Sequence, residues 1–161
     1  MLRPGILVAI AVVVLDQASK IWIAAEIGLG QGVPVTGFFN LVHVLNTGIS
    51  FSLFQAGELS RWIFTILALA VAAGLIVWLR RATSMWTAVA LGGIIGGAVG
   101  NTIDRVRLGA VVDFLDFHAA GFHWPAFNVA DSAIVMGAVM IMAEGLFSGP
   151  RRGAKGDDHR H

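Results

Sequence analysis

Long apolar stretches with few charged residues recur along the chain, and they predict membrane-spanning helices. A spanning helix needs about 20 predominantly apolar residues. The first stretch is interrupted by Asp16 and Lys20 and the last carries Glu144, whereas the two between them contain no charged residue. The pattern therefore predicts four helices, over about residues 5–25, 62–79, 82–103 and 132–149.

The polar segments between these helices divide unequally between the two ends of the bundle. With four spans, the segments 26–60 and 104–131 fall at one end, while both termini and a tight turn fall at the other. Seven Lys and Arg residues lie at the terminus end, against four at the loop end. Because cytoplasmic segments carry the excess of Lys and Arg, we expect cytoplasmic termini and long loops outside the inner (cytoplasmic) membrane.

One short segment has a different pattern. Residues 38–45 are rich in strand-forming side chains and are bounded by Gly37 and by the turn sequence Asn46-Thr47-Gly48. A small extracytoplasmic sheet is the prediction for this segment, with a helix as the alternative.

Composition agrees with a membrane protein. Hydrophobic residues make up 57% of the 161 residues, charged residues make up 13%, and the mean hydropathy is +0.78. Soluble proteins have about 45–50% apolar and about 25% charged residues. The net charge of +1 argues against nucleic-acid binding, and the absence of cysteine excludes disulfides and thiolate chemistry. We expect one integral membrane domain, 1–150, and a polar cytoplasmic tail, 151–161.

The ionisable pair in the first predicted helix, Asp16 and Lys20, is four residues apart and so shares one helix face. A structural ion pair that ties this helix into the bundle is the simpler interpretation. A functional role is the alternative, because ionisable residues at membrane depth often mark functional sites.

Glycine recurs at four-residue spacing in the third predicted helix. One row contains Gly92, Gly96 and Gly100, and a second contains Gly93 and Gly97. Rows of small residues allow neighbouring helix backbones to approach closely. We interpret both rows as packing surfaces.

Two aspartates are expected at the outer membrane interface. Asp113 lies between Val112 and Phe114, and apolar surroundings disfavour the charged carboxylate and raise its pKa. Asp131 lies at the start of the fourth helix, where a carboxylate can cap free backbone N–H groups. Capping alone would account for Asp131.

The two aspartates also suggest a joint role. They lie at the same membrane level and are joined by a 17-residue loop that can fold back. Two neighbouring carboxylates do not both ionise easily, so they share a proton. One can then take a proton from water while the other donates a hydrogen bond to a carbonyl, which is the chemistry of an aspartic protease.

Two other chemistries are weaker. His118, His123 and Asp116 could bind a cation, but the five-residue spacing of the histidines matches no zinc motif on a helix. A Ser19–Lys20 dyad is disfavoured because adjacent residues point in different directions on a helix. We therefore expect no metal and no cofactor.

Several sequence blocks in this order resemble the bacterial lipoprotein signal peptidases, also called type II or prolipoprotein signal peptidases. The resemblance covers about residues 16–144. The blocks are Asp16-Gln17-x-x-Lys20, Asn46-Thr47-Gly48-Ile49-Ser50-Phe51-Ser52, Gly96-Gly97-Ala98-x-Gly100-Asn101-x-x-Asp104-Arg105, Gly109-x-Val111-Val112-Asp113-Phe114 and Pro125-x-Phe127-Asn128-x-Ala130-Asp131-Ser132. One departure is Ile49-Ser50, because the family usually has small residues there.

The resemblance implies an all-α membrane fold with four transmembrane helices, a small extracytoplasmic β-cradle and a short helix. It also implies that Asp113 and Asp131 are catalytic, at the periplasmic face. The supporting or substrate-binding positions would be Asp16, Lys20, Asn46, Gly48, Asn101, Arg105 and Asn128.

The function that the resemblance implies is an aspartic endopeptidase for diacylglyceryl-modified prolipoproteins, which cuts just before the lipidated cysteine. Membrane lipid and globomycin-like cyclic peptide inhibitors would be further partners. A small proton-coupled transporter that uses the two aspartates is the alternative, although transport carboxylates lie near the bilayer midplane. A lipid phosphotransferase would need a metal-binding cluster of aspartates on a helix, which the sequence lacks.

Overall fold

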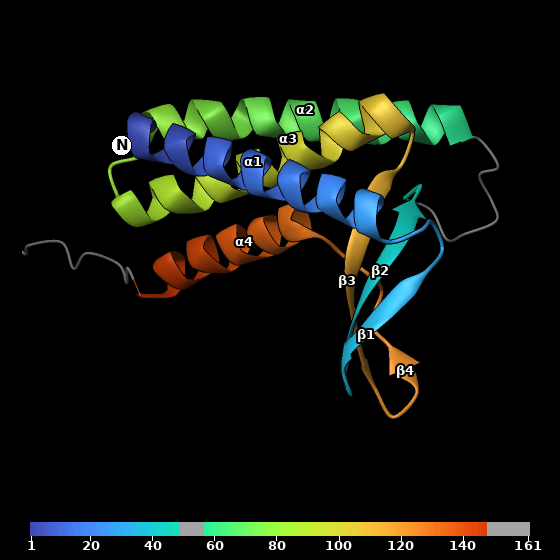
Figure 1. Ribbon diagram of the computed structural model, residues 1–161. Helices are drawn as coiled ribbons and strands as arrows, with labels where there is room; N and C mark the ends of the chain where they lie inside the picture. Colours follow the sequence, from blue (N-terminus) through green and yellow to red (C-terminus); the bar gives the residue numbers. More distant parts are fainter. Residues whose placement is uncertain (49–56, 148–161) are drawn as a thin grey trace, which may run out of the picture.

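The computed structural model describes residues 1–48 and 57–147, which contain four long helices. Each is long and apolar enough to cross a membrane, and this confirms the predicted all-α membrane architecture. Figure 1 shows them side by side, with the start of the first, the end of the last and the connection between the middle two at one end. The helices are α1 (Leu2–Glu26), α2 (Gly57–Arg81), α3 (Met85–Leu108) and α4 (Val129–Phe147).

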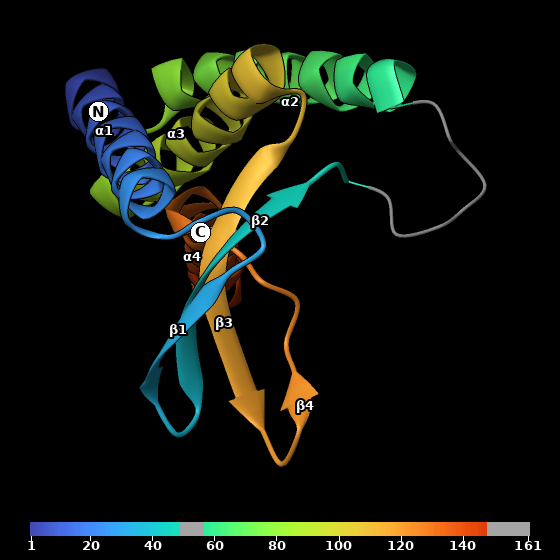
Figure 2. The same cartoon turned by 45° about the vertical axis from the view of Figure 1, so that its right-hand side comes forward.

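A small antiparallel sheet lies at the other end of the bundle and projects sideways from it (Figures 1 and 2). Its strands pair in chain order: β1 (Gly32–Thr36), β2 (Phe39–Asn46), β3 (Val111–Ala119) and β4 (Phe122–His123). The strand predicted over 38–45 is β2. In its register with β3, Val44 lies opposite Asp113 and Asn46 lies opposite Val111.

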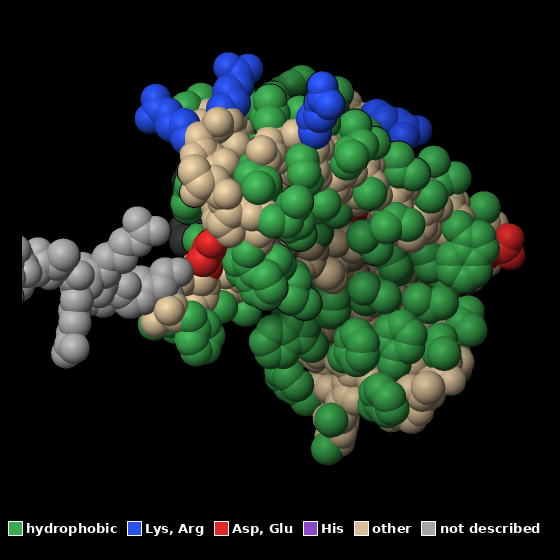
Figure 3. Space-filling view, turned by 90° about the vertical axis from the view of Figure 1, so that its left-hand side faces the viewer, with side chains coloured by type: hydrophobic (Ala, Val, Ile, Leu, Met, Phe, Trp, Pro, Cys, Tyr) green, Lys and Arg blue, Asp and Glu red, His purple; other side chains and the backbone are tan. Residues whose placement is uncertain are grey.

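The helix α3 forms the centre of the bundle. Residues buried inside the protein make up 67% of its spanning window, against 11–17% for the other three helices. The outer faces of those three helices are apolar and exposed, as a surface in contact with lipid should be. Figure 3 views the end with the α2–α3 connection, where Lys and Arg side chains gather along one rim.

The glycine rows of α3 receive two different neighbours. A Cβ atom added at Gly96 would lie 2.6 Å from the carbonyl oxygen of Ala9 in α1. One added at Gly97 would collide with the carbonyl oxygen of Ala130 in α4. The first row therefore packs against α1 and the second against α4, and the predicted packing role is confirmed.

The element bounds differ from the sequence prediction in two instructive places. Helix α3 continues through Asp104 to Leu108, although the prediction ended it at Ile103. The prediction placed Asp104 at the start of the loop 104–131, whereas it lies in α3 and its carboxylate is 4% exposed and paired with Lys20. Helix α4 begins at Val129 rather than at residue 132, so Asp131 lies inside its first turn.

The remaining bounds shift by a few residues. Helix α2 begins at Gly57 rather than at 62, with Glu58 and Arg61 forming an exposed ion pair across its first turn. Helix α3 begins at Met85 because the Ser84 hydroxyl caps it by accepting from the Thr87 N–H. The implied short outer helix is not among the elements of residues 1–48 and 57–147. Ile49-Ser50 and the tail 151–161 lie outside the described residues.

Candidate active site

Strand β3 carries Asp113. Two amide groups hold the side chain of Asp113 in a buried position. Asp113 is 2% exposed. Asn46 of β2 donates to its Oδ2 at 2.9 Å, and Asn128 donates to its Oδ1 at 2.7 Å. Burial raises the pKa of Asp113 to about 6; the Asn46 amide opposes this, and the negative charge of Asp131 adds to it.

The Asn46 amide is itself oriented by a turn. Its Oδ1 accepts the Gly48 N–H at 2.8 Å, so its Nδ2 is directed to Asp113. Gly48 has φ +89°, a left-handed conformation that glycine adopts without strain. A Cβ atom there would lie 3.1 Å from the Phe64 ring. Gly48 therefore supports the site through backbone geometry.

The N-terminus of α4 positions Asp131 through a reciprocal cap. Asn128 Oδ1 accepts the Asp131 N–H at 2.9 Å, and Asp131 Oδ2 accepts the Asn128 N–H at 3.3 Å. Its other oxygen, Oδ1, accepts from the Asn101 side chain at 2.7 Å. Asn128 is therefore the N-cap residue of α4, and the Asp131 carboxylate completes the cap by accepting a backbone N–H, which agrees with the simpler interpretation. Its other oxygen faces the network that holds Asp113.

Asn128 joins the two carboxylates. It is fully buried, and its Nδ2 donates to Asp113 Oδ1, to the Val112 carbonyl and to Asn101 Oδ1. Its Oδ1 accepts from Asp131 N–H. Asn128 thus contacts both carboxylates, that of Asp113 through its side chain and that of Asp131 through its backbone N–H. The structure therefore brings Asp113 and Asp131 into a single hydrogen-bonded cluster.

Lys20 lies behind this cluster and confirms the predicted ion pair. Its Nζ is 2.8 Å from Asp16 Oδ2, 2.8 Å from Asp104 Oδ2 and 3.0 Å from Asn101 Oδ1. Asp16 Oδ1 also accepts the Ala130 N–H at 2.9 Å. The buried cation therefore contacts the amide that holds Asp131, and its partner Asp16 binds the first turn of α4.

The candidate site residues inferred from the sequence left out two members of this network, Gln17 and Asp104, although both stand in the blocks that carry the family resemblance. Gln17 Nε2 donates to Asp104 Oδ1 at 2.9 Å and to Asp16 Oδ2 and the Gly100 carbonyl at 3.2 Å. Asp104 Oδ2 accepts the Val112 N–H at 3.2 Å, which fixes the start of β3 beside α3. A polar residue next to Asp16 in an apolar helix was the available signal for Gln17.

Arg105 lies at the edge of the cluster. Its guanidinium donates to the Asn101 carbonyl at 3.5 Å and stacks over the Phe64 ring, with 5.7 Å to the ring centroid. It forms no ion pair within residues 1–48 and 57–147. Among the described residues, the Asn101 carbonyl is the one hydrogen-bond acceptor of its guanidinium.

The alternative catalytic groups lie apart from the carboxylates or are engaged elsewhere. His123 Nδ1 is 2.9 Å from Asp116, which also accepts from Asn40 at 2.8 Å. Burial of Asp116 opposes its ionisation, but these hydrogen bonds hold its pKa below the ordinary value. The described part of the chain has no group of three His, Asp or Glu residues arranged to hold a metal. Ser19 donates to the Asp16 carbonyl rather than to Lys20.

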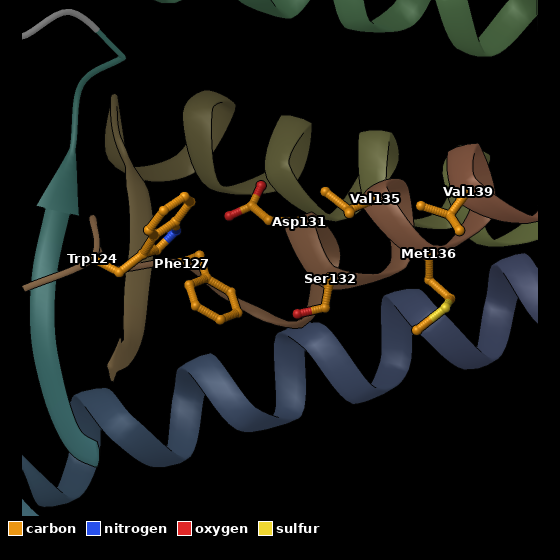
Figure 4. Close-up of a pocket in the computed structure, with 7 residues that line it drawn as sticks. All are labelled: Trp124, Phe127, Asp131, Ser132, Val135, Met136 and Val139. Carbon is orange, nitrogen blue, oxygen red and sulfur yellow. The ribbon is translucent and has the colours of Figure 1, made fainter. Parts of the chain in front are cut away.

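Two apolar grooves meet at Asp131. The first, about 530 Å³, runs along α4 and is lined by Trp124, Phe127, Val135 and Met136 among others (Figure 4). The second, about 320 Å³, lies between α2, α3 and α4, with Asn101 and Arg105 beside Asp131 in its lining. In Figure 4, Val135, Met136 and Val139 follow α4 to one side of Asp131, and Trp124 and Phe127 lie on its other side.

Comparison with known proteins identifies the family. The family model for signal peptidase (SPase) II matches residues 8–147. The chain belongs to the signal peptidase II family. The site described above therefore lies in a membrane-embedded peptidase with several spans.

Individual members of the signal peptidase II family support the same assignment. The lipoprotein signal peptidase of Cupriavidus necator is 53% identical over 141 residues, 86% of this chain and 80% of the relative. That of Aeromonas hydrophila is 50% identical over 144 residues, 87% of this chain and 86% of the relative. A solved bacterial membrane enzyme at 2.3 Å resolution has a TM-score of 0.80 and 30% identity, and the match covers 94% of this chain and 92% of that one.

Most residues that the sequence analysis proposed for a signal peptidase II site converge in the structure. Asp113 and Asp131 share the cluster with Asp16, Lys20, Asn46, Asn101 and Asn128, while Gly48 and Arg105 flank it. Asp116 is on the same strand as Asp113 but belongs to a separate cluster with His123.

Proposed function

We propose that this chain is an aspartic endopeptidase that removes the signal peptide from diacylglyceryl-modified prolipoproteins, just before the lipidated cysteine. The observation that carries the proposal is the pair of carboxylates, Asp113 and Asp131, joined through Asn128 and bordered by apolar grooves. Family membership supports the reaction, and the geometry supports the chemistry. The apolar signal helix would enter from the bilayer along these grooves.

In the proposed mechanism Asp113 carries the shared proton at rest, because burial raises its pKa. Asp131 takes a proton from a water molecule, whose oxygen bonds to the scissile carbonyl carbon while Asp113 protonates the carbonyl oxygen. The tetrahedral intermediate then collapses. The C–N bond breaks, Asp131 returns its proton to the leaving amine of the cysteine, and Asp113 regains a proton from the hydroxyl group.

The surrounding groups have distinct tasks in this proposal. Asn128 and Asn101 hold the two carboxylates in register, and Asn46 limits how far the Asp113 pKa rises. Arg105 would bind substrate carbonyl oxygens, because its guanidinium has donors to spare at the edge of the Asp131 groove. Globomycin-like cyclic peptides would inhibit by occupying the same grooves.

The location of both carboxylates favours hydrolysis over proton-coupled transport. Asp113 lies in the sheet outside the spans, and Asp131 lies in the first turn of α4. Transport carboxylates belong near the bilayer midplane. We further propose that the carboxylates face the periplasm and that both termini are cytoplasmic.

The test is cleavage of a purified diacylglyceryl-modified prolipoprotein by the protein in detergent, with and without a chelator. We expect cleavage before the modified cysteine, unchanged by chelator and by thiol- or serine-directed reagents. Activity that disappears with chelator and returns with added metal would contradict the aspartic mechanism. It would point instead to the region of His118 and His123.

A further inference from the structure

The two carboxylates border cavities of different character. The grooves at Asp131 are lined mainly by apolar side chains of the membrane-spanning helices. Asp113 borders a third, smaller cavity of about 250 Å³, to which Asn46 and Thr47 contribute polar groups. We call Asp113 and Asp131 the dyad. The lining of the cavities therefore changes across the dyad, from apolar at Asp131 to mixed polar and apolar at Asp113.

The small cavity lies outside the spanning helices. Its walls are residues 44–47, at the end of β2 and just after it, and Pro125 and Ala126 of the segment that leads to α4. Figure 2 shows the end of β2 and the segment between β4 and α4 beside β3. Val44 is 41% exposed. A chain that leaves the dyad through this cavity passes from the membrane interior towards water.

We propose that this cavity receives the substrate residue that follows the lipidated cysteine. The signal helix and acyl chains then lie on the Asp131 side. This assignment of the small cavity rests on the proposed function, because it places two parts of one prolipoprotein substrate on opposite sides of the dyad. The substrate changes character at the scissile bond, since its signal helix is apolar and the released lipoprotein continues into water. The cavity linings also change from apolar, at Asp131, to partly polar, at Asp113.

Val44 is the residue that sets the size of this subsite. It lies directly opposite Asp113 in the β2–β3 register, and directly opposed residues project from the same face of an antiparallel pair. Its side chain is thus a wall of the cavity beside the carboxylate. Enlarging it should exclude bulky substrate residues, and shortening it should admit them.

The experiment measures kcat/KM for matched lipidated prolipoproteins with Gly, Ser or Trp after the cysteine. Val44→Phe should lower cleavage of the Trp substrate relative to the Gly substrate by about tenfold or more, the scale of a steric change in a specificity pocket. Val44→Ala should shift the same ratio in favour of Trp. Val33→Phe is the matched control, because Val33 is half exposed on β1 and does not border this cavity.

A second substrate series varies the residue before the cysteine. We expect neither Val44 variant to alter preference there. The assignment is overturned if Val44→Ala changes all substrates by one factor, or if it alters preference before the cysteine. The Val44→Ala measurement tests the assignment even if Val44→Phe fails to fold. Wild-type protein that cleaves none of the lipidated substrates would instead overturn the proposed function, and this assignment with it.

Discussion

Side-chain and backbone groups hold Asp113 and Asp131 in place, and asparagine would fit either position with little change in shape. Asn keeps one acceptor oxygen, while its NH2 group would face one of the two N–H donors that hold each carboxylate. It can neither take a proton from water nor share one with its partner. Asp113→Asn and Asp131→Asn should therefore fold and bind substrate, yet cleave about 10³-fold more slowly or worse. The double variant should be scarcely slower than either single one. Turnover and thermal stability in detergent, measured together, check both points.

Asp116→Asn is the matched control for this experiment. Asp116 is three residues from Asp113 on the same strand, but its partners are His123 and Asn40, so it should keep most activity. With Asn in place of Asp131, the side-chain oxygen could still accept the Asn128 N–H that completes the cap of α4. An active Asp131→Asn protein would therefore mean that the carboxylate serves only as the cap of α4.

The raised pKa of Asp113 gives the dyad a defined pH response. Asp113 carries its proton below its pKa of about 6 and loses it above, which leaves two neighbouring negative charges and no donor for the substrate carbonyl. We therefore expect kcat/KM, which reports the free enzyme, to fall as the pH rises through about 6. Asn46→Ala removes a hydrogen bond that lowers this pKa, so the fall should move to higher pH. A kcat/KM that instead rises through this range would mean that Asp113 acts ionised.

Among the helices, α3 accepts neighbours only because its glycines leave room for their backbones. Gly97→Leu would place a side chain where the Ala130 carbonyl and Ile134 of α4 now lie, and this would separate α4 from α3. We expect poor accumulation or a lowered melting temperature, measured by thermal denaturation in detergent. Gly74→Leu on α2 is the control, because a Cβ atom added at Gly74 would meet no atom within 4 Å. A stable but inactive Gly97→Leu protein would indicate a direct part in the site.

Helices were easier to predict from the sequence than the short elements beside them. Hydropathy located all four spans because each needs a long apolar stretch, and the strand-rich segment 38–45 predicted β2. Strand β1 had no such signal, since its residues are exposed and include Pro34. Strand β4 has only two residues, and it pairs with β3 at positions adjacent to a turn.

The candidate site was predictable where a residue stood out against its surroundings. Asp113 among apolar side chains and Asp131 at a helix start were both visible in the sequence. The burial of Asp104 was not, because it depends on Lys20, which is distant in the sequence and close only after α1 and α3 pack. The role of Gln17 was not predicted for the same reason, because its partners on α3 lie more than 80 residues away in the sequence.

At the scale of the whole molecule, the orientation in the membrane remains a prediction. The excess of Lys and Arg at the terminus end indicates that this end is cytoplasmic. A reporter fused after Gly149 should therefore be active only in the cytoplasm, and one inserted near Gly57 only in the periplasm. The reverse pattern would put the carboxylates on the cytoplasmic side and contradict the proposed substrate.

The close pairing of Asp16 with Lys20 also has a consequence for biogenesis. During synthesis α1 reaches the translocon long before α3 and α4, which later supply Asp104 and the Ala130 N–H. An isolated charge at the centre of an inserting helix costs about 2.5–3.5 kcal/mol on translocon scales. Because Asp16 and Lys20 lie one turn apart, α1 brings a counter-ion for each charge with it. Helix α1 can thus remain in the bilayer as a locally neutral segment until α3 and α4 have been inserted and pack against it.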